Sequence, residues 1–440
     1  MAERTIKLGE ILGASEVEAY AVSVEEQSVS VAKQIETLYT TGVGGLGVRV
    51  IVDKRIGFFA TSSLKARDVE KAVETAYKIA RLSELDKEWC SFPKKTGKAH
   101  VEGIFDRETA DIEPETLIGG TAQMIDAVNN CGENLSITRA EVAAGREEVA
   151  IANSHGCSLW REETSAVANI SVKAEKNGQR GISSEDQQAR SWKKLDCSLV
   201  ASMAAYRASK VVHAKSIVGG KMPVVWQNKL FASIVRIMFG GTLSADSIQR
   251  GRSPWVDKVE EAVTAEDFNL FDDGLLRGGL GTREFDDDGM AQRNVPLIDR
   301  GVLRGFLYDN YTANKEGRES TGNASRDYRG IPVPSTNNLF LKPGKAKREE
   351  LLDVKKGLYI VETIGEWLSN PVSGDLSATA TNAFLIENGE LAQPVKGVIV
   401  SGNFFEILRS GIDLLGDDVD NWGSTYAPST RISQMTVTGE

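Results

Sequence analysis

The chain has 440 residues and a formal net charge of −10, with ordinary fractions of apolar and charged residues. This length exceeds what one hydrophobic core usually organises, so two or three domains are expected. The acidic balance argues against a general nucleic-acid binder, because such a protein needs a basic face to neutralise phosphates. The sequence shows neither an apolar signal segment nor a run as long as a membrane span, so we expect a cytoplasmic protein.

The first segment is predicted to be α+β. Alternating or β-branched residues predict strands, and a 3.6-residue apolar repeat after Ser63 predicts a helix. The predicted strands cover residues 17–24, 29–38, 47–52 and 56–60. The glycine cluster at residues 41–47 lacks the Lys-Ser/Thr of a phosphate loop and opens a strand, so we expect a flexible turn or an edge bulge there.

Residues 84–113 form a polar connector, which is a possible boundary between subdomains. A helix is predicted from Pro114 to the residue before Gly132, because proline suits a first turn. An antiparallel meander follows, and after a loop a helix is predicted from about 195 to 213. The strands of the meander are expected at residues 136–143, 147–153, 158–162 and 166–175. We therefore expect one α+β region over residues 1–218, with antiparallel sheets and flanking helices.

The four cysteines, at positions 90, 131, 157 and 197, show no CxxC spacing. They predict reduced, mostly structural thiols. His155 and Cys157 could supply two metal ligands, but the other two histidines belong to different predicted elements. We interpret this pair as a turn after a strand, with a metal site as the alternative.

Residues 219–440 are predicted to form a β-rich, barrel-like domain with short helices. Residues 297–303 and 385–391 both follow the pattern Leu-Ile-acid-x-Gly-x-Leu, which predicts two hairpins. The repeat indicates either a pseudo-symmetric β structure or common turn chemistry. Residues 404–415 carry an apolar stripe at helical spacing, for which core packing is expected before a partner-facing role. A short helix is expected at 307–315 and a final strand from Ser429.

Two further segments of this domain could carry function. Asp286, Asp287 and Asp288 could bind a divalent cation, but adjacent side chains alternate in direction, so we expect a solvated turn. Residues 322–338 form a loop rich in Gly, Pro, Ser and Asn, long enough to be mobile or functional.

Residues 223–253 predict a strand, a buried helix, a double glycine and a second short helix. Apolar side chains cover most of the circumference of the first helix, so it is a core element. One narrow polar stripe remains at the i, i+4, i+7, i+11 spacing of a single face: Lys229, Ser233, Arg236 and Gly240. Whatever this helix presents to a cleft is therefore presented by this stripe.

Four long motifs in the second half resemble the TldD and PmbA (TldE) family, once called modulators of DNA gyrase. They are GGLGTREFDDDG at 278–289, RGVLRGFLYDNYTANKEGRESTGNA at 300–324, NPVSGDLSATATNAFLIENGELAQPV at 370–395 and VIVSGN at 398–403. Family members of the TldD type carry a zinc-protease helix of the form HExxxH. Laid residue by residue, its histidines fall on Arg236 and Gly241 and its glutamate on Ile237. The cysteine ligand of the TldD type has no counterpart around residues 421–426.

Catalytic zinc takes three protein ligands plus a water, with a nearby base. Arginine has no lone pair to give, and isoleucine and glycine have no side-chain donor atom. We therefore expect no catalytic residue and no metal on this helix, which is either a degenerate site or simply core. The resemblance implies a PmbA/TldE-like subunit without a cofactor, whose zinc lies on a TldD-type partner.

By the same resemblance, the pair degrades unstructured peptides and trims leader peptides. A β-rich domain can hold an extended peptide by adding it as a strand. The expected cleft wall is the polar stripe together with one loop of the barrel-like domain: Lys229, Ser233, Arg236, Asn370 and Asp375. Arg236 would hold a peptide carbonyl or C-terminal carboxylate.

Two other functions remain open from the sequence. The chain could be a homodimeric binding or regulatory protein without hydrolytic activity, of the kind that the gyrase label describes. It could also be an independent hydrolase with a carboxylate metal site at Asp286, Asp287 and Asp288.

Overall fold

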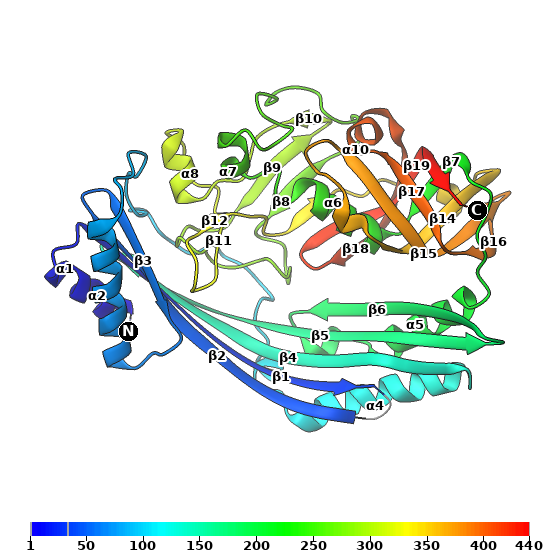
Figure 1. Ribbon diagram of the computed structural model, residues 1–440, viewed down its shortest axis with the longest axis horizontal. Coiled ribbons are helices and arrows are strands. Elements are labelled where there is room, and N and C mark those ends of the chain that lie inside the picture. The colour runs from blue at the N-terminus through cyan, green and yellow to red at the C-terminus, as the bar shows by residue number, and fades with distance from the viewer. Residues whose placement is uncertain (1, 33–34, 440) are drawn as a thin grey trace.

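The structure is a computed structural model that describes residues 2–32 and 35–439. Figure 1 shows a long curved sheet, built by the first half of the chain, beneath a second domain that contains a barrel. No helix in these described ranges is long and apolar enough to cross a membrane. The expected α+β class, with antiparallel sheet first and a barrel-like domain second, is confirmed.

The N-terminal sheet is antiparallel, with strand order β3-β2-β1-β4-β5-β6. Its strands are β1 (Glu16–Val31), β2 (Ile35–Val52), β3 (Arg55–Thr61), β4 (Leu135–Asn153), β5 (Ser158–Lys176) and β6 (Gln179–Ala189). Segments predicted as separate strands at 17–24, 136–143 and 147–153 are parts of longer strands, and β6 was predicted to be loop. Part of the predicted strand 29–38 falls at positions 33–34, outside the described residues.

The predicted breaks were wrong because polar residues occur in the middle of these strands. Glu25 of β1 pairs in register with Arg146 of β4, and Arg146 Nη2 lies 2.7 Å from Glu25 Oε2. A charged cross-strand pair on the solvent side stabilises a sheet and does not end it. In β6 the inward positions are Gly181, Ser183 and Glu185, which are buried against other elements although none is apolar.

The glycine cluster at residues 41–47 lies inside β2, so the predicted turn or bulge is wrong. Its glycines let the second domain approach the strand. A Cβ atom at Gly45 would lie 2.2 Å from the ring of Tyr328, and one at Gly47 would lie 2.4 Å from the Tyr328 carbonyl oxygen. Only glycine leaves room for this contact, which is the role of a strand glycine at a close backbone approach.

The predicted helices of the first half are confirmed. Helix α2 (Ala66–Leu82) buries its apolar stripe against the sheet, and α4 (Pro114–Cys131) begins at proline as expected. Helix α5 (Cys197–Val211) begins after Asp196, whose side chain accepts a hydrogen bond from the Leu199 N–H. The remaining helical segments here are α1 (Ala2–Ile11), α3 (Arg107–Ala110) and η1 (Trp192–Lys194).

The second domain contains a closed ring of five strands, because β19 pairs both with β17 and with β7. The ring consists of β7 (Gly220–Trp226), β14 (Lys356–Ile364), β15 (Asp375–Glu387), β17 (Val398–Asn403) and β19 (Thr425–Thr438). The same sheet continues through β13 (Leu339–Leu341), β8 (Leu270–Asp273), β9 (Asn294–Asp299) and β10 (Val302–Leu303), with β16 (Glu390–Val395) beside β15 and β18 (Ile412–Trp422) beside β19.

Both predicted hairpins form, β9–β10 and β15–β16. Their central residues have positive φ, 47° and 77° at Arg300 and Gly301 and 52° and 84° at Asn388 and Gly389. Positive φ at both positions is what a type I′ turn requires.

Other segments of the second domain differ in part from expectation. The helix predicted at 404–415 consists of α10 (Phe404–Glu406) and a π-helical turn, η3 (Ile407–Gly411), after which β18 begins. Its Phe404 and Leu408 are fully buried, so core packing is confirmed. The remaining elements are α6 (Asn228–Phe239), α7 (Ala245–Gln249), α8 (Asn310–Lys315), α9 (Arg348–Leu352), η2 (Glu366–Leu368), β11 (Ala324–Ser325) and β12 (Val333–Pro334).

Candidate functional site

Helix α6 packs inside the second domain with one face left polar. Its apolar residues belong to the main hydrophobic core, as predicted. Lys229, the second residue of the helix, reaches out of this domain to the N-terminal sheet. Its Nζ donates to the Glu185 carboxylate and to the Asp186 carbonyl oxygen, both on β6. Lys229 therefore joins α6 to the N-terminal sheet.

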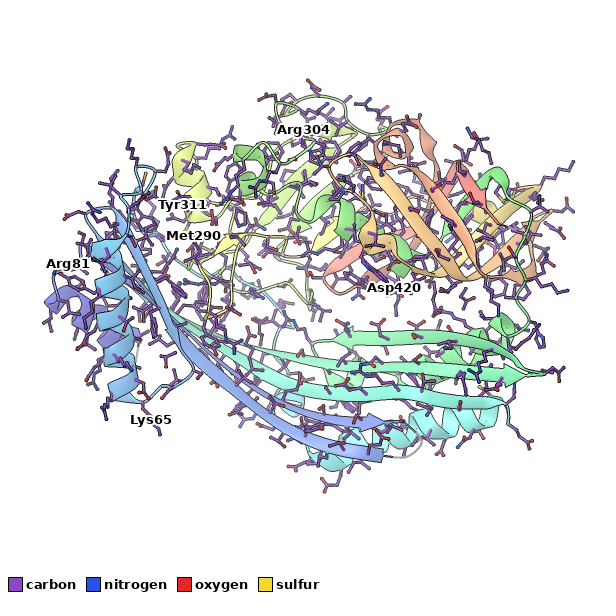
Figure 2. All side chains as sticks on the ribbon, viewed as in Figure 1. Lys65, Arg81, Met290, Arg304, Tyr311 and Asp420 are labelled. Carbon is purple, nitrogen blue, oxygen red and sulfur yellow. The ribbon has the colours of Figure 1, made fainter. Side chains whose placement is uncertain are left out.

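Glu185 is the centre of this junction. Its second oxygen lies 2.6 Å from Arg207 Nη1 on α5, so one buried carboxylate is held between two cations. Burial raises the pKa of Asp186 and Asp420, while Lys229 opposes the shift. Figure 2 shows Asp420, from β18, at the edge of the second domain that faces β6. Acidic groups from both halves thus surround the Lys229 ammonium.

A cavity of about 810 Å³ opens beside this junction, between β5 and β6 on one side and α6, β14, η2 and β18 on the other. Of the predicted stripe, Lys229 and Ser233 line it. Ser233 is 5 % exposed and its Oγ donates to the Leu230 carbonyl oxygen. At the rim, Trp367 and Trp422 are 60 % and 49 % exposed. Such a cavity has the size of a typical ligand site.

Arg236, Asn370 and Asp375 lie outside the residues that line this cavity. The Asn370–Asp375 loop closes on itself, because the Asn370 N–H donates to the Asp375 carbonyl oxygen over 2.8 Å. The lining instead includes side chains that the sequence analysis missed: Glu185, Arg207, Glu362, Trp367 and Trp422. One sequence signal could have revealed Glu185. Small or polar residues at every second position, Gly181, Ser183 and Glu185, indicate a strand with a polar inner face, which is β6.

Arg236 is half-buried one turn beyond Ser233. Its Nη1 lies 2.8 Å from Thr336 Oγ1, and burial lowers its pKa while nearby Asp272 opposes the shift. The guanidinium lies over Gly240, where a Cβ atom would meet Nη1 at 2.2 Å. A Cβ atom at Gly241, in contrast, would meet nothing within 4 Å. Open space therefore surrounds Gly241, on which the sequence resemblance placed the second histidine of HExxxH.

The turn of three aspartates is buried, so the expectation of a solvated turn is wrong. Asp286, Asp287 and Asp288 are at most 2 % exposed. Asp286 accepts hydrogen bonds from the backbone N–H groups of Asp288, Met290 and Ala324. Because the carboxylate oxygens point at N–H donors, the turn has no oxygen set aimed at a cation. In the part of the chain that the structure describes, no group of three or more His, Cys, Asp or Glu side chains is placed to hold a metal.

The other two aspartates tie the turn to the N-terminal sheet. Asp287 Oδ1 accepts from Arg161 Nη2 over 2.8 Å and from the Tyr20 hydroxyl over 3.0 Å. Asp288 Oδ1 accepts from Arg49 Nη2 over 2.9 Å. We call these groups, with two further side chains, the interdomain ion cluster: Glu18, Tyr20, Arg49, Arg161, Asp287, Asp288 and Arg326.

The charges of this cluster compensate one another. Burial alone would raise the pKa of Asp287, but Arg161 and Arg283 outweigh it and the pKa is lowered. Burial would likewise raise the pKa of Glu18, but Arg326 and Arg49 outweigh burial, so the pKa of Glu18 is also lowered. Burial and the adjacent Asp288 raise the pKa of Asp286 well above its ordinary value. The cluster is a structural joint between the N-terminal sheet and the second domain.

His155 and Cys157 belong to separate interactions. His155 Nε2 lies 2.9 Å from Glu16 Oε2, and Cys157 is buried, where burial raises the pKa of its thiol to about 11. The two residues lie in the turn between β4 and β5, as the interpretation of a turn after a strand predicted.

A curved antiparallel sheet joined to a closed five-stranded barrel, with a polar helix face at their junction, is the arrangement of a known class of protein. Family models match in three segments, described as PmbA/TldA metallopeptidase domain 1 over 17–80, central domain over 107–211 and C-terminal domain over 219–439. Together they span most of the sequence, and the chain belongs to the PmbA/TldD metallopeptidase family.

Individual relatives agree with this assignment. Metalloprotease PmbA of Escherichia coli O157:H7 is 25% identical over 92% of this chain and 88% of its own. A putative modulator of a DNA gyrase from Thermotoga maritima is 26% identical, with a TM-score of 0.89 and 99% of each chain covered. TldE from Thermococcus kodakarensis has the same fold, with a TM-score of 0.92, 24% identity and 99% of each chain covered.

Proposed function

We propose that this chain is the PmbA/TldE-like subunit of a cytoplasmic two-subunit metallopeptidase, in which it binds no metal and forms part of the peptide cleft. The observation that carries the proposal is the chemistry of α6 beside the cavity. The positions that correspond to HExxxH are Arg236, Ile237 and Gly241, and none of them offers an atom that can ligate zinc. Zinc and its base are then supplied by a TldD-type partner.

The cavity suits an extended, unstructured peptide or a leader peptide. It lies along β6, which in the described residues pairs with β5 on one side only. On its other side, the Ser184 N–H donates over 2.8 Å to the Glu362 carboxylate from β14. A peptide main chain offers the same kind of acceptor, so a strand edge of this type recognises backbone and little sequence. Lys229 and Ser233 would then contact the peptide from the opposite wall, and Arg207 would contact it from α5.

The deciding experiment measures peptidase activity on an unstructured peptide for this chain alone, for a TldD-type protein alone and for their mixture. Activity that appears only on mixing, with zinc found on the TldD-type protein, supports the proposal. Full activity of the TldD-type protein alone, unchanged by this chain, contradicts it. Size-exclusion chromatography of the same samples reports complex formation, because a heterodimer depends on the concentration of both chains.

A homodimeric binding or regulatory role is the second candidate, and the likeness to the Thermotoga maritima protein, described as a putative modulator of a DNA gyrase, favours it. It predicts a dimer of this chain alone that persists unchanged when the TldD-type protein is added. The independent hydrolase with metal at Asp286, Asp287 and Asp288 has lost its support, because these carboxylates already accept hydrogen bonds from arginines and backbone N–H groups.

A further inference from the structure

A second groove, of about 420 Å³, lies on the other side of Arg207 from the large cavity. One wall comes from α5 and the other from the outer surface of the barrel at β14, β15 and β16, with α9 at the edge. The ion pair between Arg207 and Glu185 separates the groove from the cavity, so the two spaces share a wall. Nothing in the proposed function uses this groove.

The α5 wall is a single helix face. Met203, Tyr206, Arg207 and Lys210 line the groove at the i, i+3, i+4, i+7 spacing, while the opposite face of the helix is buried against the N-terminal sheet. Tyr206 is 58 % exposed. An aromatic ring left this open on a helix whose other face is core is available for contact with a ligand.

The barrel wall is an apolar floor built by strand register. Tyr359 of β14 pairs with Phe384 of β15, and Phe384 pairs with Pro394 of β16, so the three side chains form one row across the strands. Val361 and Leu391 extend the row on either side. The floor side chains carry one hydroxyl among them, so the floor fits a hydrocarbon or aromatic side chain better than a sugar or a nucleobase.

The charged residues of the groove all have the same sign. Arg207, Lys210 and Arg348 line it and no carboxylate does, although the chain as a whole has a net charge of −10. Arg207 is compensated by Glu185, 2.6 Å away. Lys210 and Arg348 make no ion pair within the described residues; each lies over a tyrosine ring, at 5.1 Å from Tyr206 and 5.3 Å from Tyr359.

We propose that this groove binds an acidic peptide segment that carries an aromatic or long aliphatic side chain between its carboxylates. The hydrocarbon side chain would lie on the row of Tyr359, Phe384 and Pro394. Carboxylates on either side of it would meet Lys210 on α5 and Arg348 on α9. Two cations on opposite rims, held above an apolar floor, are complementary to this alternation of charge and hydrocarbon.

A bound segment would contact both halves of the protein at once, because α5 belongs to the first half and β14 to β16 belong to the second. It would also contact Arg207, whose ion pair with Glu185 leads to Lys229 at the cavity. The groove is thus placed to anchor one part of a long peptide while another part occupies the cavity, although its own binding does not depend on the peptidase role.

The test uses the full chain and a fluorescein-labelled peptide of sequence Asp-Glu-Phe-Glu-Asp-Leu-Glu-Asp, with binding followed by fluorescence anisotropy. Two peptides of the same length serve as controls, one with lysine at each acidic position and one with serine in place of Phe and Leu. Saturable binding of the first peptide, weakened by salt and at least about tenfold weaker for each control, is the expected result.

Charge reversal locates the site. Lys210→Glu and Arg348→Glu should each weaken binding about tenfold, whereas Lys210→Arg should retain it. The matched control is Lys71→Glu, an exposed lysine on α2 at the opposite end of the molecule (Figure 1), which should leave binding unchanged. Thermal unfolding verifies that each variant is folded. The proposal would be overturned if the first peptide and the control with serine in place of Phe and Leu bound equally well. It would also be overturned if neither charge-reversal variant bound the first peptide more weakly.

Discussion

Arg161 Nη2 on β5 lies 2.8 Å from Asp287 Oδ1 in the second domain, and both side chains are 1 % exposed. This ion pair joins residues 126 positions apart in the sequence and connects the curved sheet to the barrel domain. Removal of one partner of such a pair leaves the other charge buried without compensation, which costs far more than loss of a pair at the surface.

Replacement of Arg161 by methionine should therefore lower the free energy of unfolding by about 3–5 kcal/mol. The matched control is Arg4→Met, because Arg4 pairs with Glu70 at the surface and both side chains are more than 40 % exposed; that change should cost less than about 1 kcal/mol. Urea denaturation measures both values. If Arg161→Met cost no more than Arg4→Met, the interdomain ion cluster would not be the joint described above.

The glycines of β2 offer a matched pair of substitutions. Gly47→Ala should destabilise the protein by about 1–3 kcal/mol, because its Cβ atom would lie 2.4 Å from the Tyr328 carbonyl oxygen and the backbone must move. Gly42→Ala, where no atom lies within 4 Å of the added carbon, should change stability by less than about 0.5 kcal/mol. Thermal unfolding of the two variants tests why these glycines are needed. A loss of stability in Gly47→Ala alone indicates close approach of the two domains, whereas equal losses indicate a general need for backbone flexibility at residues 41–47.

The two glycines at the end of α6 provide a second matched pair of substitutions. Gly240→Ala should displace the Arg236 guanidinium from Thr336 and cost about 1–2 kcal/mol, since the added carbon would meet Nη1 at 2.2 Å and the Arg236 carbonyl oxygen at 2.6 Å. Gly241→Ala should be neutral or slightly stabilising, because the site is open. Equal effects of the two substitutions, measured by urea denaturation, would show that Arg236 is not held in place by Gly240.

Asp272 should make stability depend on pH. Burial raises its pKa to about 7 from an ordinary value of 3.8, against hydrogen bonds from Asn323 and Asn337. The folded protein then keeps a proton that the unfolded chain releases, so the stabilisation is complete below pH 4 and is lost as the pH rises through 7. Relative to Asp272→Asn, the native protein should lose up to about 1.4 kcal/mol per pH unit over this window. Urea denaturation at several pH values tests this, and parallel profiles for the two proteins would contradict it.

Lys229 offers a test of the junction in the proposed complex with a TldD-type protein. Lys229→Met removes the cation that joins α6 to Glu185 and Asp186, so the cavity wall loses its link to β6. We expect peptidase activity of the mixture with a TldD-type protein to fall about tenfold, with complex formation unchanged on size-exclusion chromatography. Lys71→Met, on the exposed side of α2, serves as the control and should retain full activity.

Local signals were sufficient for much of the fold. Helical periodicity located α2, α4, α5 and α6, and the Asn388-Gly389 dipeptide fixed a hairpin, because each of these signals is contained in a short stretch of chain. The prediction broke the long strands into shorter ones, since Glu25 and Arg146 interrupt apolar runs in the sequence. Only their pairing across β1 and β4 shows why these charged residues fit within a strand.

Of the residues that line the cavity, only those on helix α6 could be predicted from the sequence. The spacing of Lys229 and Ser233 on one helix face placed both at the cavity. Glu185, 44 positions away from Lys229, could not be found from spacing, because its charged partners come from two other elements, α5 and α6. The same reason explains the error at the aspartate turn, where Asp287 pairs with Arg161, 126 positions away in the sequence.

The ring of β-strands is completed by its last member in the chain, β19, which pairs with the first, β7, across more than two hundred intervening positions. During synthesis β19 can be added only after residue 438 has left the ribosome, so the backbone N–H and C=O groups along the two open edges of the partly built barrel stay unpaired until then. The curved sheet, finished at residue 189, can mature long before that moment. Chaperone demand in the cell should therefore come from the later half of the protein.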